Sequence, residues 1–525
     1  MKSRIIGRAN QRVSLSSAVL LLAGSTIIGT ILGILRTKLI NSNFNNFESD
    51  AYFAAFKIPD FVFFTLASGA LGVALLPVLS DRLQKSKQSA WEVASYILNA
   101  LAVVAFIAAI VIMVFAEPLM KYVVAPGFTP EQLQLSVAIM RIVSVNIFLF
   151  AISTVLTTLQ QAVGRFFFLA IAPLFYNGCI IASIFIFGHK LGIVGLGLGV
   201  AIGAVLQLLV VTLGMVGMDF HYRAFIDFKN KPFREVLRIL PARSIDQGMD
   251  YIEGIIETRF ASELTIGSVT NYENALILYN APVALIGTAI STAAFPRLTE
   301  RLAQGRSDLF RRDFLRVLRT MIWIAAPVAV LSYFSREYLA RIIFARSNQE
   351  IALIFGFLCI SIFFRIIYSI ISRYFYAHKD TKTPLYVSFF VVALNIVLAY
   401  SLSKPSVFNV AGLAIAQSIV ALTEVAILIV IMIIRDPKFF DWPFAKSVIR
   451  ILSVTGCSAV AGFIAVHFLP LGLFDRGINI LFKLTIITAV VCSVHVLISY
   501  AFDFEESKVV VGRIKQFMLK PMRIE

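Results

Sequence analysis

Residues 91–116 read WEVASYILNALAVVAFIAAIVIMVFA and carry one charged side chain, Glu92. A helix needs about 20 mostly apolar residues to cross the hydrocarbon core of a bilayer, and this stretch is long enough. Similar runs recur along the 525 residues, and 59% of the chain is hydrophobic, against about 45–50% in soluble domains. The composition excludes a soluble enzyme, a disordered chain and a secreted disulfide scaffold, and it predicts an all-α multi-pass membrane protein.

Fourteen apolar runs are predicted to be transmembrane helices. They lie at 14–35, 51–79, 91–116, 133–160, 166–187, 191–217, 236–260, 271–296, 314–334, 351–376, 384–402, 410–434, 447–469 and 478–501. The run at 236–260 is rich in charge, but without it the basic segment 297–319 would face outside. Most of the 47 Lys and Arg then fall on the side of the N-terminus, so both termini are predicted to be cytoplasmic. The net charge of +17 is thereby explained by topology and anionic lipid, and no nucleic-acid partner is expected.

The sequence repeats itself at a nearly constant spacing. PVLSDRL at 77–83 resembles PRLTERL at 296–302, which lies 219 residues later. Two further pairs, at spacings of 218 and 217, are Asn177 with Asn395 and Gly195 with Gly412. Such a period indicates a duplicated structural unit.

The repeat predicts two pseudo-symmetric six-helix lobes around a central cavity. The first lobe is 1–220, the second is 221–440, and 441–525 adds a helix pair and a basic cytoplasmic tail. Six is an even number, so the lobes enter the membrane in the same sense. Transporters of this kind hold the substrate between the two lobes and open the site alternately to each side. A duplicated channel or receptor is the alternative.

An acidic stripe runs along the charged span 236–260. Its members, at i, i+4, i+7 and i+11, are Asp246, Asp250, Glu253 and Glu257. This spacing places them along one side of a helix, and charge inside a membrane marks a functional site. The stripe is predicted to be a coupling site, together with Glu273, for protons or a monovalent cation. Arg243, Arg259, a metal ion of unknown identity or a cationic substrate could also neutralise it, and a solvated face lining a wet vestibule is the alternative.

Cationic side chains in other spans are candidates for binding an anionic headgroup. Arg36 ends the first span and Lys57 lies in the second, where Arg favours bidentate phosphate contacts and Lys acts as a point charge. The alternatives are snorkelling of Arg36 to the membrane surface and an ion pair between Lys57 and Asp60. Arg365 lies in the middle of the tenth span, facing the cavity or an acidic partner, for which Glu424 is the candidate.

Motifs of enzymes are absent from the sequence. It holds no Walker loop, no zinc-binding His-Glu-x-x-His and no dinucleotide fingerprint, and its five histidines share no ligand spacing. We therefore expect neither enzymatic activity nor a cofactor. The energy for transport would come from an ion gradient, the membrane potential or the gradient of the substrate.

Several short motifs occur in a recognisable order. They are Leu32-Gly33 followed by Arg36, DAYFAAFKIP at 50–59, APGF at 125–128, GRF at 164–166 and DTKTP at 380–384. In this order they resemble the MurJ (MviN) family of lipid II flippases, within the multidrug/oligosaccharidyl-lipid/polysaccharide (MOP) exporter superfamily. The resemblance implies two lobes in a V around a cavity, with a groove for a lipid tail on the last two helices. By position, Arg36, Asp50 and Lys57 correspond to charged cavity residues around the headgroup.

The resemblance also implies a substrate, an undecaprenyl-pyrophosphate-linked disaccharide pentapeptide (lipid II). Such proteins move it from the inner to the outer leaflet of the bacterial cytoplasmic membrane for peptidoglycan synthesis, and thus for cell-wall biogenesis and cell shape. Membrane lipid and cell-wall synthesis proteins are then the expected partners. Two alternatives remain, a cation-coupled exporter of another lipid-linked or cationic substrate, and a non-transporting scaffold of cell-wall synthesis.

The sequence resembles a divergent member of this family. Three arginines that are usual in the family fall here on Thr30, on Phe63 or Phe64, and on Ala275. The acidic stripe is not a usual family feature either. Arg243, Arg259 and Arg365 are the candidates to supply the missing cationic contacts.

Overall fold

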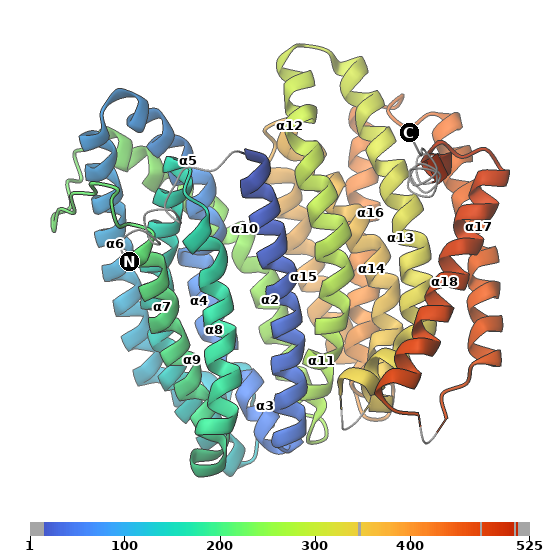
Figure 1. The fold of residues 1–525 in the computed structure, drawn as a ribbon, viewed down its shortest axis with the longest axis horizontal. Coiled ribbons are helices and arrows are strands. Elements are labelled where there is room, and N and C mark those ends of the chain that lie inside the picture. The colour runs from blue at the N-terminus through green and yellow to red at the C-terminus, as the bar shows by residue number, and fades with distance from the viewer. Residues whose placement is uncertain (1–14, 345–347, 473–474, 509–510, 513–525) are drawn as a thin grey trace, which may run out of the picture. The chain divides into compact units, whose positions relative to one another are not determined.

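The computed structural model describes residues 15–344, 348–472, 475–508 and 511–512. Within these ranges the side chains of residues 15–20, 68–74, 239–243, 245–247 and 250 fall outside the description. All regular elements of the described residues are helices (Figure 1), which confirms the predicted all-α class. The chain forms two compact units, Met1–Thr270 and Asn271–Glu525.

The first unit contains nine α-helices and one π-helical turn among its described residues. They are α2 (Leu15–Asn43), α3 (Asn46–Ala55), α4 (Lys57–Leu66), α5 (Ser68–Lys85), α6 (Lys87–Leu119), η1 (Met120–Val124), α7 (Pro130–Val163), α8 (Phe167–Ile186), α9 (Gly188–Leu213) and α10 (Lys231–Ser262). The long helices α6, α7 and α9 pack in sequence, α8 packs on α9, and α2 packs on α8 (Figure 1).

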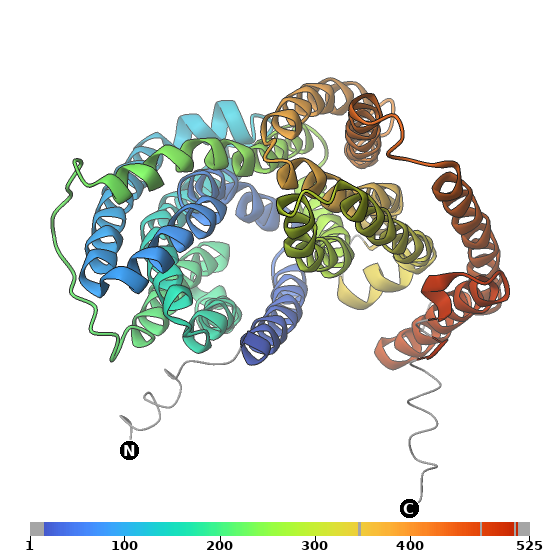
Figure 2. The ribbon, with the colours of Figure 1, turned by 90° about the horizontal axis from the view of Figure 1, so that it is seen from above.

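The second unit begins within α11 and is built in the same way. Its elements are α11 (Ser268–Pro282), η2 (Val283–Thr288), α12 (Ala289–Ala303), α13 (Ser307–Ile343), α14 (Asn348–Ala377), α15 (Lys382–Leu402), α16 (Ala411–Arg435), α17 (Trp442–Phe468) and α18 (Gly477–Ala501). The pair α17–α18 packs against α13, and Figure 2 shows its two helices side by side.

The same pairing of helices recurs in the two units. In the first, α6 packs on α7, α7 on α9 and α8 on α9; in the second, α13 packs on α14, α14 on α16 and α15 on α16. The helices α7 and α14 are the most enclosed, with 56% and 61% of their apolar windows buried. The recurrence of one pairing pattern agrees with the spacing of the sequence repeat.

Local sequence signals set the ends of several helices. Thr129 begins α7 with a capping box, in which its Oγ1 accepts from the Gln132 amide and the Gln132 side chain accepts from the Thr129 amide. The same helix ends at Gly164, whose φ of 84° lies in the left-handed region that glycine adopts without strain. Asp441 caps α17 by accepting from the Phe444 amide at 2.9 Å.

Twelve helices of the described residues are long and apolar enough to cross a membrane, so the predicted count of fourteen is not confirmed. The run 51–79 is divided into α3, α4 and α5 by breaks at Phe56 and Ala67, and each piece is short. The run 236–260 is one continuous part of α10, but its charges keep it below the hydropathy of a typical span. It is the predicted span that is rich in charged residues.

The boundary between the compact units lies at residue 270. The reason is α10, which packs on α4 and α5 of the first unit. A Cβ added at Gly248 would come within 2.8 Å of Thr65 Oγ1, so the two helices approach closely there. The division into lobes at 1–220 and 221–440, with 441–525 appended, stays a prediction about the repeat and not about compactness.

Candidate functional site

Arg36 is placed in a polar cluster inside the first unit. Its Nη1 donates to Asn177 Oδ1 at 3.1 Å, which joins α2 to α8. The Nε of Arg36 is buried and has no hydrogen-bond partner among the described residues. Tyr52 and Tyr176 lie within electrostatic range of both Arg36 and Asp60. Arg36 therefore keeps a buried donor without an acceptor among the described residues, and the cluster has aromatic hydroxyls beside it.

Asn177 and the two tyrosines were not predicted as site residues. The sequence repeat, in which Asn177 pairs with Asn395, is the signal that could have indicated a role for Asn177. Tyr52 lies in the DAYFAAFKIP motif, where its neighbours Asp50 and Lys57 drew attention instead. Uncharged partners of a buried cation leave little trace in hydropathy.

Lys57 lies against the face of α10 that packs on α4. Its Nζ is 3.6 Å from the place where a Cβ on Gly254 would stand. One turn earlier, Tyr251 stacks on Phe64 with ring centroids 4.2 Å apart. Gly248, Tyr251 and Gly254 are spaced by three residues, so this seam follows one side of the helix. An aromatic stack thus occupies the region where the resemblance expected an arginine.

The acidic stripe lies partly within the described side chains. Glu253 and Glu257 are buried, with exposed fractions of 7% and 5%, and they flank Gly254, over which the Lys57 amine lies. The side chains of Arg243, Asp246 and Asp250 fall outside the described residues. Two buried carboxylates therefore lie on α10 within three residues of Gly254, the residue that the Lys57 amine approaches. Their predicted part in coupling stays a prediction.

Asp50 is buried, and its carboxylate accepts three hydrogen bonds. It accepts from the Gly267 amide at 2.6 Å, from the Thr270 amide at 2.7 Å and from Thr270 Oγ1 at 2.7 Å. These contacts hold α3 against the turn that opens α11 and satisfy amide groups at a helix start. The geometry gives Asp50 a structural role, and its predicted part in substrate binding stays a prediction.

Arg259 caps a helix end. Its Nη1 donates to the carbonyl oxygens of Tyr122 and Val123, in η1 at the end of α6. Cations are favoured at the C-terminal ends of helices, where carbonyl groups lack partners. This contact ties α10 to η1.

Arg365 and Glu424 form the ion pair for which the sequence made them candidates. Arg365 Nη1 and Glu424 Oε2 lie 3.1 Å apart, joining α14 to α16 inside the second unit. The guanidinium also lies over the Tyr368 ring, 5.4 Å from its centroid. Glu424 is only 3% exposed, so the pair satisfies a carboxylate that would be costly to bury alone.

Two predicted features of α11 lie close together in the chain. Glu273 is half-buried, and Ala275, where the resemblance expected an arginine, is fully buried. Nearby, Asn271 Nδ2 donates to Glu350 Oε2. Among the side chains that the structure describes, no group of three His, Cys, Asp or Glu is arranged to hold a metal ion.

The DTKTP motif forms a capped turn between α14 and α15. Asp380 accepts from the Lys382 and Thr383 amides and from Thr383 Oγ1, and pairs with Arg435 Nη1 at 2.7 Å. Partial burial opposes ionisation of Asp380, but the Thr383 hydrogen bonds and the Arg435 ion pair together lower its pKa to about 2. The motif therefore stabilises the helix junction, because Asp380 satisfies amide groups at the start of α15.

Comparison with known proteins identifies the family. Residues 41–494 match the family described as "Lipid II flippase MurJ". The chain belongs to the MurJ family. It is 24% identical over 421 residues to a protein of Borreliella burgdorferi named "Probable lipid II flippase MurJ", and this covers 79% of the chain and 82% of that protein. The predicted resemblance is thus confirmed.

Solved structures confirm the fold of the MurJ family for this chain. A structure titled "Lipid II flippase MurJ, inward closed conformation" superimposes with a TM-score of 0.77 at 21% identity and covers 92% of this chain and 99% of its own. An inward-facing MATE transporter of the MOP superfamily follows with a TM-score of 0.67 at 14% identity, covering 83% of this chain and 98% of its own. The chain is a multi-pass membrane protein of a transporter family.

Proposed function

We propose that this chain moves lipid II from the inner to the outer leaflet of the bacterial cytoplasmic membrane by alternating access. The observation that carries the proposal is the match of residues 41–494 to the MurJ family, because it spans nearly all of the helices. Both termini would be cytoplasmic, as the distribution of Lys and Arg indicates. The pyrophosphate headgroup would cross through a polar pathway in the protein, while the polyprenyl tail stays in lipid.

Arg36 and Lys57 are the proposed headgroup contacts. The buried Nε of Arg36 has no protein partner among the described residues, so a phosphate oxygen would supply the acceptor that the fold leaves out. Asn177 fixes one end of the guanidinium and thereby orients the rest. Lys57 would add a point charge from α4. Arg243 and Arg259 stay proposed as supplementary cations, as does Arg365, which would have to exchange Glu424 for phosphate.

Glu253 and Glu257 are the proposed coupling groups, with Asp246, Asp250 and Glu273 as further members. Their charge would change on protonation or on binding of a monovalent cation. Such a change alters the transport cycle only if the proton or cation has different affinities for the two orientations of the protein. Lys57 gives a route for this effect, because its amine lies over Gly254 and neutralising the neighbouring carboxylates would change the electrostatic potential at that amine.

Complementation tests the proposed function. A strain depleted of its own lipid II flippase should regain growth and cell shape when the chain is expressed. Arg36→Ala combined with Lys57→Ala should fail to restore growth at equal membrane abundance. A wild-type chain that reaches the membrane and still does not restore growth would contradict the assignment of lipid II.

A second candidate function is a cation-coupled exporter of another substrate, which the buried Glu253 and Glu257 favour. Glu253→Gln combined with Glu257→Gln separates the two functions. If lipid II movement persists but no longer depends on the ion gradient, the carboxylates serve coupling. If the chain never moves lipid II but exports another lipid-linked or cationic substrate in a manner that depends on the ion gradient, the second candidate is correct. A scaffold would tolerate all of these changes without a phenotype.

A further inference from the structure

A basic cleft lies at one end of the second unit, between α13, the start of α17 and the segment after α18. Its volume is about 350 Å³, within the usual size of ligand sites. The arginines that line it are Arg311, Arg312, Arg316 and Arg319, and the acidic residues are Asp308, Asp441 and Glu505. The positions 312, 316 and 319 follow one face of α13.

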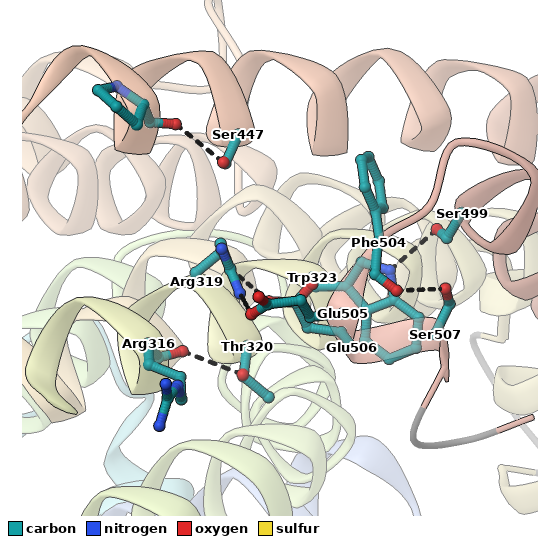
Figure 3. Close-up of polar contacts among 11 residues, drawn as sticks. Arg316, Arg319, Thr320, Trp323, Ser447, Ser499, Phe504, Glu505, Glu506 and Ser507 are labelled. Carbon is teal, nitrogen blue, oxygen red and sulfur yellow. Dashed lines mark hydrogen bonds and ion pairs between the residues drawn. The ribbon is translucent and has the colours of Figure 1, made fainter. Parts of the chain in front are cut away.

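Two of the four arginines build the walls of the cleft. Arg311 Nε donates to the Phe439 carbonyl at 2.7 Å, and its Nη2 contacts Asp441 Oδ2 at 3.3 Å, which holds the start of α17. Arg319 pairs with Glu505 and Glu506 and holds the segment after α18, as Figure 3 shows. The ion pair with Arg319 lowers the pKa of Glu505, so this carboxylate stays ionised.

The other two arginines are open. Arg312 and Arg316 are exposed, lie one helical turn apart, and make no side-chain hydrogen bond or ion pair within the described residues. In Figure 3 the only dashed line at Arg316 ends on its main-chain oxygen, which accepts from Thr320. Two guanidinium groups side by side in a concave site match the oxygens of one phosphate group.

The length and composition of α13 indicate that the cleft is at the level of lipid headgroups. The helix α13 has 37 residues, about 55 Å at 1.5 Å per residue, so it extends well beyond a hydrocarbon core of about 30 Å. Its apolar part follows Arg319, from Met321 onward. Trp442, 73% exposed at the start of α17, is of the type that anchors helices at the membrane surface.

The positive charge of the C-terminal tail argues against this tail as the ligand of the basic cleft. The C-terminal residues 513–525 carry four Lys or Arg and one Glu, so this tail is repelled by the open arginines. We propose that the cleft binds the phosphodiester headgroup of an anionic phospholipid between Arg312 and Arg316. The bound lipid holds α13 and α17 at the membrane surface. Glu505 competes with the phosphate for Arg319.

Lipid retention by the purified full-length chain tests this site. The protein is exchanged in detergent against phosphatidylglycerol or phosphatidylcholine, and bound lipid is counted by native mass spectrometry. Wild type should retain phosphatidylglycerol in preference to phosphatidylcholine. Arg312→Gln with Arg316→Gln should lower this retention about tenfold, because the phosphate would lose both of its proposed guanidinium partners.

The matched control is Lys446→Gln with Arg450→Gln on α17. These two cations are also exposed and one turn apart, but they do not line the cleft. Their loss should change retention less than twofold. Equal losses in the two double variants, or equal retention of the two lipids, would overturn the proposal. Millimolar inorganic phosphate that displaces phosphatidylglycerol completely would assign the site to free phosphate instead.

Glu505→Gln provides a second test, which does not depend on correct folding of the Arg312/Arg316 double variant. It frees Arg319 from one carboxylate, while Glu506 keeps the segment after α18 attached. Retention of phosphatidylglycerol should rise about threefold. An unchanged or lower retention would contradict the competition between Glu505 and phosphate.

Discussion

At the scale of single residues, the charged groups of the membrane part divide into those that the fold has already satisfied and those that it has not. Asp50 and Arg365 belong to the first kind, through three hydrogen bonds and an ion pair. Arg36 belongs to the second, because its buried Nε has no partner among the described residues. Substitutions should therefore separate stability from transport.

Arg36→Gln should impair transport more than stability. A charge-assisted hydrogen bond contributes about 1.5–3 kcal/mol, so losing the headgroup contact should reduce lipid II movement about tenfold or more. Initial rates of lipid II exposure at the outer leaflet check this, with Lys38→Gln on the exposed side of the same helix as control. Equal rates for Arg36→Gln and wild type would remove Arg36 from the headgroup site.

Asp50→Asn should impair stability. The amide keeps one acceptor oxygen but turns an NH₂ group toward buried donors, and an unsatisfied buried group costs about 1–3 kcal/mol. The thermal midpoint of the purified protein should fall, whereas Glu263→Gln, which changes an exposed carboxylate, should leave it unchanged. A midpoint equal to that of wild type would show that the three hydrogen bonds contribute little.

At the scale of helices, the same close contact explains why the sequence repeat has a glycine at both Gly195 and Gly412. A Cβ at Gly195 would come within 2.7 Å of Phe187 Cβ, and one at Gly412 would overlap the Leu402 carbonyl oxygen. Both glycines lie near the start of a helix, α9 or α16, where the preceding helix, α8 or α15, ends close by. The spacing of 217 residues thus marks the same close junction in both units.

Gly412→Ala should destabilise the second unit. Overpacking at a site closed by backbone atoms costs about 1–3 kcal/mol. Gly456→Ala in α17 is the control, because nothing lies within 4 Å of the added Cβ, and the better helix propensity of Ala should raise stability by about 0.5–1 kcal/mol. Thermal unfolding compares the two variants, and equal midpoints would refute the close junction.

The Asp380 turn predicts a pH dependence. Its pKa of about 2 lies below the unfolded value of about 3.9, so its stabilisation is fully present above the unfolded value and is lost as pH falls through 2. The thermal midpoints of wild type and Asp380→Asn should differ at pH 7 and converge toward pH 2. Asp219→Asn, which changes an exposed loop carboxylate, should show no such convergence. A constant difference for Asp380→Asn would contradict the ion pair with Arg435.

At the scale of the whole molecule, composition and hydropathy were enough to predict the all-α membrane class, because apolar runs of about 20 residues are typical of transmembrane helices. They were not enough for α3–α5. Pro59 lies in the first turn of α4 and has no amide to bond to Ala55, which accounts for the break at Phe56, but hydropathy does not show that the run is divided there or at Ala67. Nor could they place α10, whose seam of Gly248, Tyr251 and Gly254 binds it to the first unit.

The candidate site was predictable where two opposite charges both lie inside apolar spans, and less so where a charged side chain has an uncharged partner. The Arg365–Glu424 pair followed from two costly charges in facing spans. The partner of Arg36 did not, because an asparagine in an apolar run has many uses. The capping roles of Asp50 and Arg259 depend on helix ends that the sequence does not bring together.

The central claim is translocation of lipid II by this chain, and its most direct measurement is the exposure of lipid II at the outer leaflet. In cells depleted of their own flippase, a membrane-impermeant enzyme that cleaves lipid II reports the outward fraction. The account predicts that the wild-type chain restores cleavage and that Arg36→Ala with Lys57→Ala does not, at equal membrane abundance. Cleavage that stays at the depleted level with wild type, or that the double variant restores fully, would contradict it.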